Sequence, residues 1–279
     1  MKIVCCAGGL GNQMFQYAFY RYLWEKGFKP YFDTSSKQLY RHTGFELQRI
    51  FPNIRIENKT TAPYLVRSIK HSIFALCWNN HFRFVGKDSE IDIKGRRFYE
   101  SVFCGYWQQH GYVGDIRAQI LKDFEFVPFE YGKNIETAKH ISKTNSVSIH
   151  MRRGDYLKPE NLKTLGSICT LDYYVRAIEF IRTRIENPEF VVFSDDMVWA
   201  KENFPLGKVL FVDWNTGKNS FRDMQLMSVC RHNIIANSTF SWWAAWLNKN
   251  DEKIVITPAK WSNTAIGGNY LALGQWIKL

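Results

Sequence analysis

The second half of the sequence alternates between short apolar segments and amphipathic segments, and this alternation limits the possible fold more than any other feature. Segments typical of β-strands occur at 147–151, 190–193, 209–212, 233–236 and 253–256. Segments with the apolar spacing of helices lie between them, at 171–186, 197–204, 221–230 and 240–247. Strands that alternate with helices form a parallel sheet covered by helices on both faces. We therefore predict an α/β domain over residues 146–260.

The first half of the chain is less regular. It opens with an apolar strand at 2–7, the glycine-rich loop GGLGNQ at 8–13 and a helix that ends near Gly27. A strand, a glycine-rich loop and a helix in succession present backbone N–H groups to a phosphate or a sugar. The loop also fits a plain tight turn that needs positive φ. We predict a smaller α/β domain over 1–145 with irregular insertions, and a tail at 261–279 that packs back on it.

Two local features of the predicted helices concern capping and packing. Ser220 is followed three residues later by Asp223, which predicts a capping box at the start of the helix 221–230. The apolar helix 240–247 contains three tryptophans, and at this spacing they are expected in the core rather than on a sugar platform. They are Trp242, Trp243 and Trp246.

Composition excludes several classes of protein. With 46% hydrophobic and 16% aromatic residues the chain is not disordered. A net charge of +11 attracts anions, yet lysines and arginines are spread along the chain, so we expect no nucleic-acid partner. The six cysteines lack metal-binding spacing, which favours free thiols in a reducing compartment. No signal peptide or membrane span is apparent, and we expect a cytoplasmic protein with, at most, peripheral contact to the anionic inner membrane.

Polar residues follow three of the predicted strands directly, where each strand ends. The segments are HMRRGDY at 150–156, FSDD at 193–196 and NSTFS at 237–241. In a parallel sheet these ends meet at one edge, where open α/β sheets bind ligands. Adjacent guanidiniums clamp phosphate oxygens, and hydroxyls at a helix start also hold phosphate. Carboxylates accept hydrogen bonds from a base or a ribose. The three segments therefore predict one shared nucleotide site.

Each of these segments also has a purely structural interpretation. Asp196 and Ser238 each precede a predicted helix and can serve as its N-cap. Asp155 can form an ion pair with Arg152 or Arg153 and serve only to hold the loop. The acidic cluster at 88–92 resembles a cation site, but a solvated face of a strand or turn is the simpler interpretation.

Four segments together resemble the bacterial α-1,2-fucosyltransferases. They are GGLGNQMFQYA, SIHMRRGDY, FSDD and the run DMQLMSVCRHNIIANSTFSWWAAWL from Asp223 to Leu247. They occur in the family's order at both ends of the chain, whereas residues 30–140 match only in general character. The resemblance implies a GT-B fold, in which two Rossmann-like domains face a central cleft. It also implies an inverting reaction that uses GDP-fucose and needs no metal or other cofactor.

The resemblance also assigns roles to individual residues. Arg152 is expected to hold the β-phosphate of GDP and to stabilise its departure. His150, Asp195 and Asp196 are expected around the nucleotide, while Gly11 and Asn12 reach in from the N-terminal domain. The further donor-binding residues that it implies are Arg153, Ser238, Thr239, Phe240 and Ser241.

The chemistry of the residues agrees with a reaction that needs no metal. Departure of the diphosphate leaves negative charge, which must be stabilised by a metal or by fixed cations and dipoles. The sequence has no Asp-x-Asp motif, and the adjacent Asp195 and Asp196 are a poor metal pair, so Arg152 and a helix N-terminus fill this role. Inversion requires attack by the acceptor hydroxyl from the opposite face, ideally with a base. Asp155 is the first candidate; the second is Glu160, whose spacing from His150 resembles that of the catalytic Glu in α-1,6 relatives. Some relatives need no protein base.

We therefore expect an enzyme that moves L-fucose from GDP-fucose to the 2-hydroxyl of a terminal β-galactoside in a bacterial glycan such as lipopolysaccharide. A transferase that uses another GDP-sugar or forms another linkage is the alternative within the same class. A non-catalytic protein that binds a glycan or a nucleotide is the alternative from a different class. Turnover of GDP-fucose distinguishes the two classes.

Overall fold

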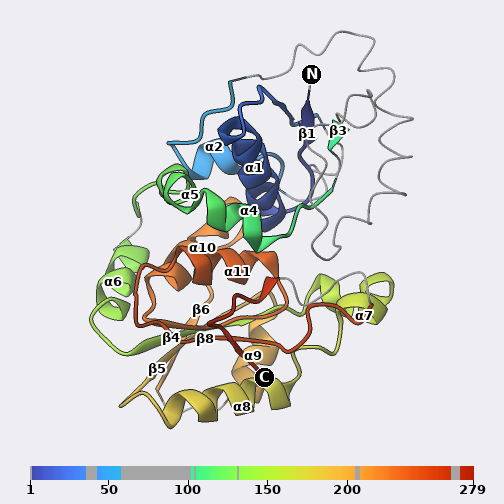
Figure 1. The fold of residues 1–279 in the computed structure, drawn as a ribbon. Helices are drawn as coiled ribbons and strands as arrows, with labels where there is room; N and C mark the ends of the chain where they lie inside the picture. The colour runs from blue at the N-terminus through green and yellow to red at the C-terminus, as the bar shows by residue number, and fades with distance from the viewer. Residues whose placement is uncertain are drawn as a thin grey trace. The chain divides into compact units, whose positions relative to one another are not determined.

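The computed structural model describes residues 2–35, 43–57, 102–103, 105–130, 132–204, 208–264 and 271–279. The chain divides into two compact units, Met1–Val127 and Pro128–Leu279 (Figure 1). The acidic cluster at 88–92 lies outside the described residues. No helix in the described ranges is both long and apolar enough to cross a membrane.

The first unit contains a parallel sheet with the strand order β2-β1-β3. The strands are β1 (Ile3–Cys5), β2 (Tyr31–Asp33) and β3 (Val102–Phe103). The helices are α1 (Leu10–Glu25), α2 (Leu47–Ile50), α4 (His110–Asp115) and α5 (Arg117–Asp123). The core is largely aromatic, and the fully buried rings include Phe15, Tyr17, Phe19, Tyr20, Phe32, Phe51 and Phe124. The strand, glycine-rich loop and helix expected at the start of the chain are all present.

The second unit contains a parallel sheet in the order β6-β5-β4-β7-β8-β9. Its strands are β4 (Ser146–Met151), β5 (Glu189–Ser194), β6 (Val209–Val212), β7 (His232–Ile234), β8 (Val255–Thr257) and β9 (Ile277–Lys278). Its longer helices are α6 (Gly132–Ile141), α8 (Leu171–Arg182), α10 (Phe221–Val229) and α11 (Thr239–Leu247). Shorter helices are η4 (Asp155–Leu157), α7 (Pro159–Leu165), α9 (Met197–Asn203) and η5 (Gly217–Asn219).

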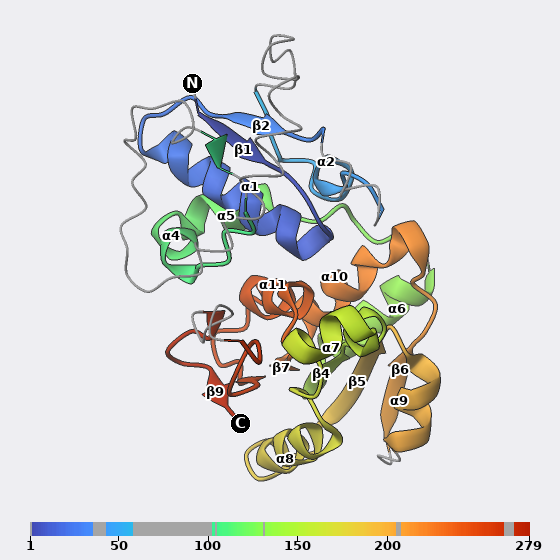
Figure 2. The same ribbon diagram turned by 90° about the vertical axis from the view of Figure 1, so that its right-hand side faces the viewer.

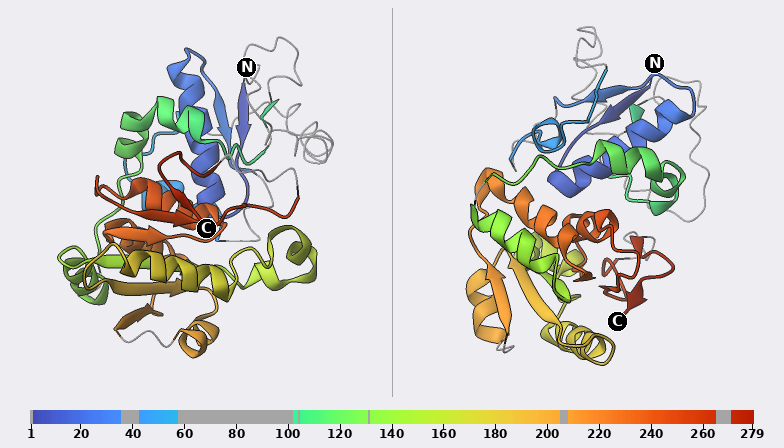
Figure 3. Two further views of the ribbon diagram at one scale, coloured as in Figure 1. Left: turned by 60° about the horizontal axis from the view of Figure 1, so that its bottom comes forward. Right: turned by 90° about the vertical axis from the view of Figure 1, so that its left-hand side faces the viewer.

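Helices cover both faces of this second sheet. Helices α8 and α9 lie on one side and α10 and α11 on the other (Figures 1 and 2), and further views show the same layers (Figure 3). The core on the α8 side joins the apolar face of α8 to the strands through Tyr173, Tyr174, Ile178 and Ile181. The α/β fold with two Rossmann-like units that the sequence predicts is confirmed.

Two boundaries differ from the expected ones. The first unit ends at Val127 rather than at residue 145, because α6 packs against α10 and its buried Asn134 donates to Asn215 Oδ1 at 2.8 Å. The end of the tail forms β9, which pairs with β8 in the sheet of the second unit through Ile256↔Ile277. The second unit thus spans residues 128–279.

The local predictions had mixed outcomes. Trp242 and Trp243 are fully buried and Trp246 is nearly so, which confirms their place in the core. The cysteines in the described ranges that can be assigned are free thiols: Cys5, Cys6, Cys169 and Cys230. The capping box is wrong: the Ser220 side chain makes no capping hydrogen bond, and Asp223 instead accepts from Asn215 Nδ2 at 2.9 Å.

Candidate functional site

The three polar segments meet at one edge of the second sheet. Strands β5, β4 and β7 are direct neighbours and run parallel, so the loops after them emerge side by side. These loops carry the residues after Met151, after Ser194 and after Ile234. The sheet topology therefore brings together the arginines, the paired aspartates and the start of α11.

Arg152 is held by two carboxylates. Its Nη2 lies 2.7 Å from Asp155 Oδ1 and its Nη1 lies 3.0 Å from Asp195 Oδ2. The guanidinium has five N–H donors, so these two contacts orient it without using all of its donors. About a third of the Arg152 side chain is exposed, which leaves the cation accessible to a ligand. The ion pair of Asp155 with Arg152 that we considered from the sequence is present.

Arg153 is fixed by a second set of contacts. Its Nε lies 3.0 Å from Asp196 Oδ2, and its guanidinium stacks 3.8 Å from the ring of Trp199. Its backbone N donates to Asp195 Oδ1 at 2.8 Å. The hydrogen bond from Arg153 lowers the pKa of the Asp196 carboxyl below its ordinary value. Both aspartates after β5 thus serve the arginines after β4.

Asp196 and Ser238 also have the structural roles that the sequence allows. Asp196 is the N-cap of α9 and accepts from Trp199 N at 3.2 Å. Ser238 is the N-cap of α11 and accepts from Phe240 N at 3.3 Å. The Ser241 hydroxyl is buried and donates to the carbonyls of Ala236 and Ser238, so it closes the first turn of α11. Thr239 and Phe240 are half-buried at the same turn.

Gly154 is required by the close approach of Asp195. A Cβ at this position would lie 2.7 Å from Asp195 Oδ2, which is closer than Cβ atoms come to other atoms in real structures. Its φ of −24° is not in the left-handed region, so the constraint is the space and not the backbone conformation. The glycine of the HMRRGDY segment therefore lets the aspartate reach both arginines.

His150 is buried at the end of β4 and lies beside the start of α11. Its ring centroid is 5.7 Å from that of Phe240, and its Nδ1 has no hydrogen-bond partner among the described residues. Burial lowers the pKa of His150 to about 4, and the nearby Arg152 acts in the same direction while Asp195 opposes it. The imidazole is therefore neutral near pH 7 and offers one donor and one acceptor.

Asn237 joins the loops that surround this edge, which the sequence analysis did not foresee. Its carbonyl accepts from Tyr156 Oη at 2.9 Å, and its Nδ2 donates to Leu165 O at 3.1 Å and to Trp261 O at 3.3 Å. It is 2% exposed. These bonds hold both ends of the segment that contains α7, whose first turn carries the exposed Glu160. The signal in the sequence that could have identified Asn237 is an asparagine directly before the N-cap Ser238.

Another polar cluster that the sequence analysis missed lies after β6, at the same edge of the sheet. Asn215 Nδ2 donates to Asp223 Oδ1 at 2.9 Å, and Trp214 Nε1 donates to Asn134 Oδ1 at 2.7 Å. Burial raises the pKa of Asp223 to about 7. From the sequence we assigned Asp223 only to a capping box, because its spacing from Ser220 fits that local motif.

Gly11 and Asn12 lie in the first unit, in the first turn of α1. Gln16 anchors the loop before them: its Oε1 accepts from Ala7 N at 2.9 Å and its Nε2 donates to Gly105 O at 2.9 Å. Gln13 Nε2 donates to Gly8 O at 3.0 Å. Buried amides on α1 therefore shape the glycine-rich loop.

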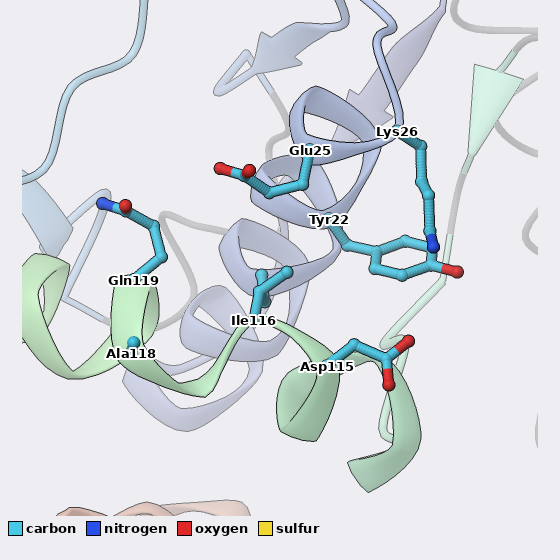
Figure 4. Close-up of a pocket in the computed structure, with 7 residues that line it drawn as sticks. All are labelled: Tyr22, Glu25, Lys26, Asp115, Ile116, Ala118 and Gln119. Atoms are coloured by element: carbon cyan, nitrogen blue, oxygen red, sulfur yellow. The ribbon is translucent and has the colours of Figure 1, made fainter.

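A cavity of about 320 Å³ lies in the first unit, between the end of α1 and the junction of α4 with α5 (Figure 4). Its lining consists of Tyr22, Glu25, Lys26, Asp115, Ile116, Ala118 and Gln119. Tyr22 follows Asn12 by ten residues of α1, which is about 15 Å along the helix axis. The cavity is therefore separate from the glycine-rich loop, and none of the predicted site residues lines it.

Comparison with known proteins supports the predicted relationship. The sequence profile of "Glycosyl transferase family 11" matches residues 2–278. An α-1,2-colitosyltransferase of Escherichia coli is 35% identical over 275 residues, which cover 91% of this chain and 90% of that protein. The O-antigen biosynthesis glycosyltransferase WbnK of Escherichia coli is 32% identical over 310 residues, with 99% of both chains covered. The solved α-1,6-fucosyltransferase NodZ, soaked with GDP-fucose, has a TM-score of 0.48 at 12% identity and covers 88% of this chain and 91% of its own.

Proposed function

The chain belongs to glycosyl transferase family 11, and we propose that it transfers L-fucose from GDP-fucose to the 2-hydroxyl of a terminal β-galactoside with inversion. The observation that carries this proposal is the placement of Arg152 between two carboxylates at the end of β4. The acceptor belongs to a bacterial surface glycan, in keeping with the O-antigen biosynthesis glycosyltransferase of Escherichia coli that this chain resembles over its whole length.

Arg152 stabilises the departing diphosphate. As the bond between fucose and phosphate breaks, negative charge grows on the phosphate oxygens while the sugar gains oxocarbenium character. The guanidinium donors that the two carboxylates leave unused bind those oxygens, and each such charged hydrogen bond contributes about 1.5–3 kcal/mol. A preorganised donor aimed at developing charge accounts for about 10²–10³ in rate. Arg153 and the first N–H groups of α11 add to the same field.

The nucleotide lies against the buried His150 and the start of α11. Among the described residues the buried Nδ1 of His150 has no hydrogen-bond partner, which costs free energy, and a ribose hydroxyl or a base would supply that partner. Asp195 and Asp196 orient the arginines as well as facing the nucleotide. Gly11 and Asn12 supply contacts from the first unit, as the resemblance of the GGLGNQ segment implies.

We assign the role of catalytic base to Glu160 rather than to Asp155, although Asp155 was the first candidate from the sequence alone. The Asp155 carboxylate is engaged by Arg152 at 2.7 Å and therefore serves to position the guanidinium. Glu160 is exposed in the first turn of α7, and Asn237 fixes the segment that carries it. Glu160 takes the proton of the acceptor hydroxyl as that oxygen attacks the sugar from the face opposite the diphosphate.

The reaction needs no metal ion, because arginines and a helix N-terminus supply the positive charge. We place the enzyme in the cytoplasm, where its net charge of +11 favours peripheral contact with the anionic inner membrane and with glycans attached to lipids there.

A panel assay tests the proposal. The enzyme is incubated with GDP-fucose and β-galactosides, lactose included, in the presence of EDTA, and the linkage of the product is read by NMR. We expect a 2-O-fucosylated galactoside. GDP binding without transfer to any member of the panel, or transfer that stops with EDTA, would contradict the proposed reaction or its metal independence respectively.

One of the relatives points to GDP-colitose as a second candidate donor. The α-1,2-colitosyltransferase of Escherichia coli is 35% identical to this chain, and colitose is fucose without its 3-hydroxyl. A site that hydrogen-bonds this hydroxyl rejects the deoxy sugar strongly, whereas a site that only packs against it discriminates weakly. The ratio of kcat/KM for GDP-fucose and GDP-colitose on the same acceptor decides between them, and we expect GDP-fucose to be preferred.

A further inference from the structure

Trp107 has an unusual backbone conformation that its own packing maintains. Its φ is 53°, in the left-handed region that bulky residues rarely adopt. The indole is 4% exposed and stacks on Phe19 with centroids 4.1 Å apart and planes 5° apart. Its carbonyl accepts from the hydroxyl of Tyr112 and from Gln109 N. A strained residue persists only where its surroundings hold it, and such residues concentrate at functional sites.

The next residue reaches across the unit to the glycine-rich loop. Gln108 Nε2 donates to Asn12 Oδ1 at 2.9 Å, although the two residues are 96 positions apart in the chain. Because the side-chain oxygen of Asn12 accepts this bond, the orientation of its amide is fixed and its amino group points away from Gln108. The turn at Trp107 thus precedes the residue that donates a hydrogen bond to Asn12 Oδ1.

Gly8 provides an independent sign that the Asn12 amide has a fixed place. A Cβ on Gly8 would lie 2.9 Å from Asn12 Nδ2, so the amino group occupies the space that a side chain would need. Gly8 also has a φ of 82°. The glycine therefore serves both the turn and the position of the amide.

We infer that Gln108 is a positioning residue that makes Asn12 a hydrogen-bond donor to an oxygen of the substrates. This inference rests on the proposed function. The oxygen belongs either to the diphosphate of the nucleotide or to a hydroxyl of the galactoside, since both accept an N–H donor. Without Gln108 the oxygen of Asn12 loses this donor, and the preference for its present orientation weakens because the oxygen and nitrogen ends of an amide have nearly the same shape.

Substitutions of Gln108 separate this role from simple packing. Gln108→Met keeps the length of the side chain and removes the hydrogen bond, and we expect kcat/KM to fall about tenfold. Gln108→Glu can only accept, so it attracts the amino group of Asn12 and turns the oxygen towards the substrate. We expect Gln108→Glu to lose about a hundredfold. If Gln108 had only a structural role, the two variants would lose kcat/KM to a similar extent, because their side chains are similar in size. The comparison requires that both variants melt within a few degrees of the wild type.

A double-mutant cycle tests whether Gln108 acts through Asn12. If Asn12→Ala lowers kcat/KM about a hundredfold, the pair Asn12→Ala with Gln108→Met should lose no more than that. Independent effects would multiply to about a thousandfold. Asn12→Asp keeps an acceptor for Gln108 but lacks the donor, and it should be as impaired as Asn12→Ala.

Two glycines provide a matched control. Gly8 and Gly27 both have φ of 82°, but a Cβ on Gly27 would meet nothing within 4 Å. Gly8→Ala and Gly27→Ala therefore introduce the same backbone strain, and only Gly8→Ala displaces the Asn12 amide. We expect similar melting temperatures for the two variants and a loss of kcat/KM of about tenfold or more for Gly8→Ala alone.

The full cycle is measured on GDP binding by calorimetry as well as on transfer to lactose. Coupling in both GDP affinity and transfer identifies a diphosphate oxygen, and coupling in the KM for lactose alone identifies the acceptor hydroxyl. Multiplicative losses in both measurements, or a Gln108→Glu variant no worse than Gln108→Met, would overturn the inference. Wild-type protein that binds GDP but does not transfer fucose would count against the proposed function, while the binding cycle would still report on Gln108.

Discussion

The two units use the same local geometry for different chemistry. In each, polar groups follow parallel strands at their carboxyl ends, where a loop leads into a helix. In the second unit the groups are charged, and Arg152 and Arg153 are held by three carboxylates. In the first unit the groups that follow β1 and β3 are neutral amides, with Gln16 fixing the loop and Gln108 contacting Asn12. Fixed charge suits a reaction that separates charge, whereas neutral amides select oxygen acceptors without altering the field.

The largest expected effect tests whether the base belongs to the charged unit. Glu160→Gln keeps the shape of the side chain but cannot accept a full proton, and we expect kcat to fall about 10²–10⁴-fold, the usual range for a general base. Asp155→Asn should lower kcat less, because it weakens only one of the two contacts that hold Arg152. The check is kcat for both variants across pH 6 to 9 at saturating donor and acceptor. Equal, small losses of kcat in both variants would mean that the base lies outside this segment or that the reaction uses no protein base.

Gly154 tests how closely the charged cluster must fit. Gly154→Ala places a methyl group 2.7 Å from Asp195 Oδ2 and so pushes the carboxylate away from both arginines. We expect kcat to fall about tenfold, in keeping with the loss of one charged hydrogen bond. Gly111→Ala is the matched control, since a Cβ there meets nothing within 4 Å. A Gly154→Ala enzyme as active as Gly111→Ala would show that the geometry of Asp195 does not affect the rate.

The pH dependence of stability should reveal two buried groups of the charged unit. The folded pKa of His150 is about 4 against an ordinary 6.5, so between these values the unfolded chain binds the extra proton and stability rises with pH. The folded pKa of Asp223 is about 7 against an ordinary 3.8, so there stability falls as pH rises. The two slopes oppose each other between about pH 4 and 6.5.

Removing either group should expose the slope of the other. Asp223→Asn should make the free energy of unfolding rise with pH by about 1 kcal/mol per unit over this range, and His150→Gln should make it fall. Urea unfolding at about pH 4.5, 5.5 and 6.5 measures both slopes. Two variants with the slope of the wild type would mean that neither group titrates differently in the folded and unfolded chain.

The smallest expected effect concerns the first unit. Tyr17 donates to the buried Asp123 at 3.0 Å, and burial raises the pKa of Tyr17. Tyr17→Phe removes that bond, but Arg21 and Gln119 still contact the carboxylate at 3.0 and 2.9 Å. We therefore expect a loss of about 1 kcal/mol in the free energy of unfolding and unchanged transfer. A tenfold loss of activity would show that the aromatic core also controls the site.

The fold was predictable wherever the apolar pattern was regular. In the second unit, β5 was predictable because a parallel strand buried on both faces is a short continuous apolar run. In β4, apolar and polar residues alternate with the period of a strand, although the structure buries every position. The end of the first unit was not predictable, because it depends on the contact of Asn134 with Asn215, which are 81 residues apart. For the same reason the pairing of β9 with β8 could not be inferred from the tail itself.

The candidate site followed from the sequence only as far as its strand ends. The sequence located Arg152, Asp195 and Asp196 because they come directly after apolar strands. It did not reveal which carboxylate engages Arg152, since that depends on side-chain positions across three loops. Gln108 was missed because its partner Asn12 lies 96 residues earlier and its turn depends on an unusual φ at a tryptophan.

We propose that the charged edge of the second unit stabilises the departing diphosphate rather than merely binding it. Arg152→Ala tests this when GDP affinity is measured by calorimetry and kcat by transfer to lactose. Arg176→Ala serves as the control, because Arg176 forms an exposed ion pair with Asp172 at 2.8 Å. We predict that kcat falls about 10²–10³-fold while the Kd for GDP weakens by about tenfold or less. A variant that loses GDP affinity and keeps its kcat would show that Arg152 only binds the diphosphate and does not stabilise its departure.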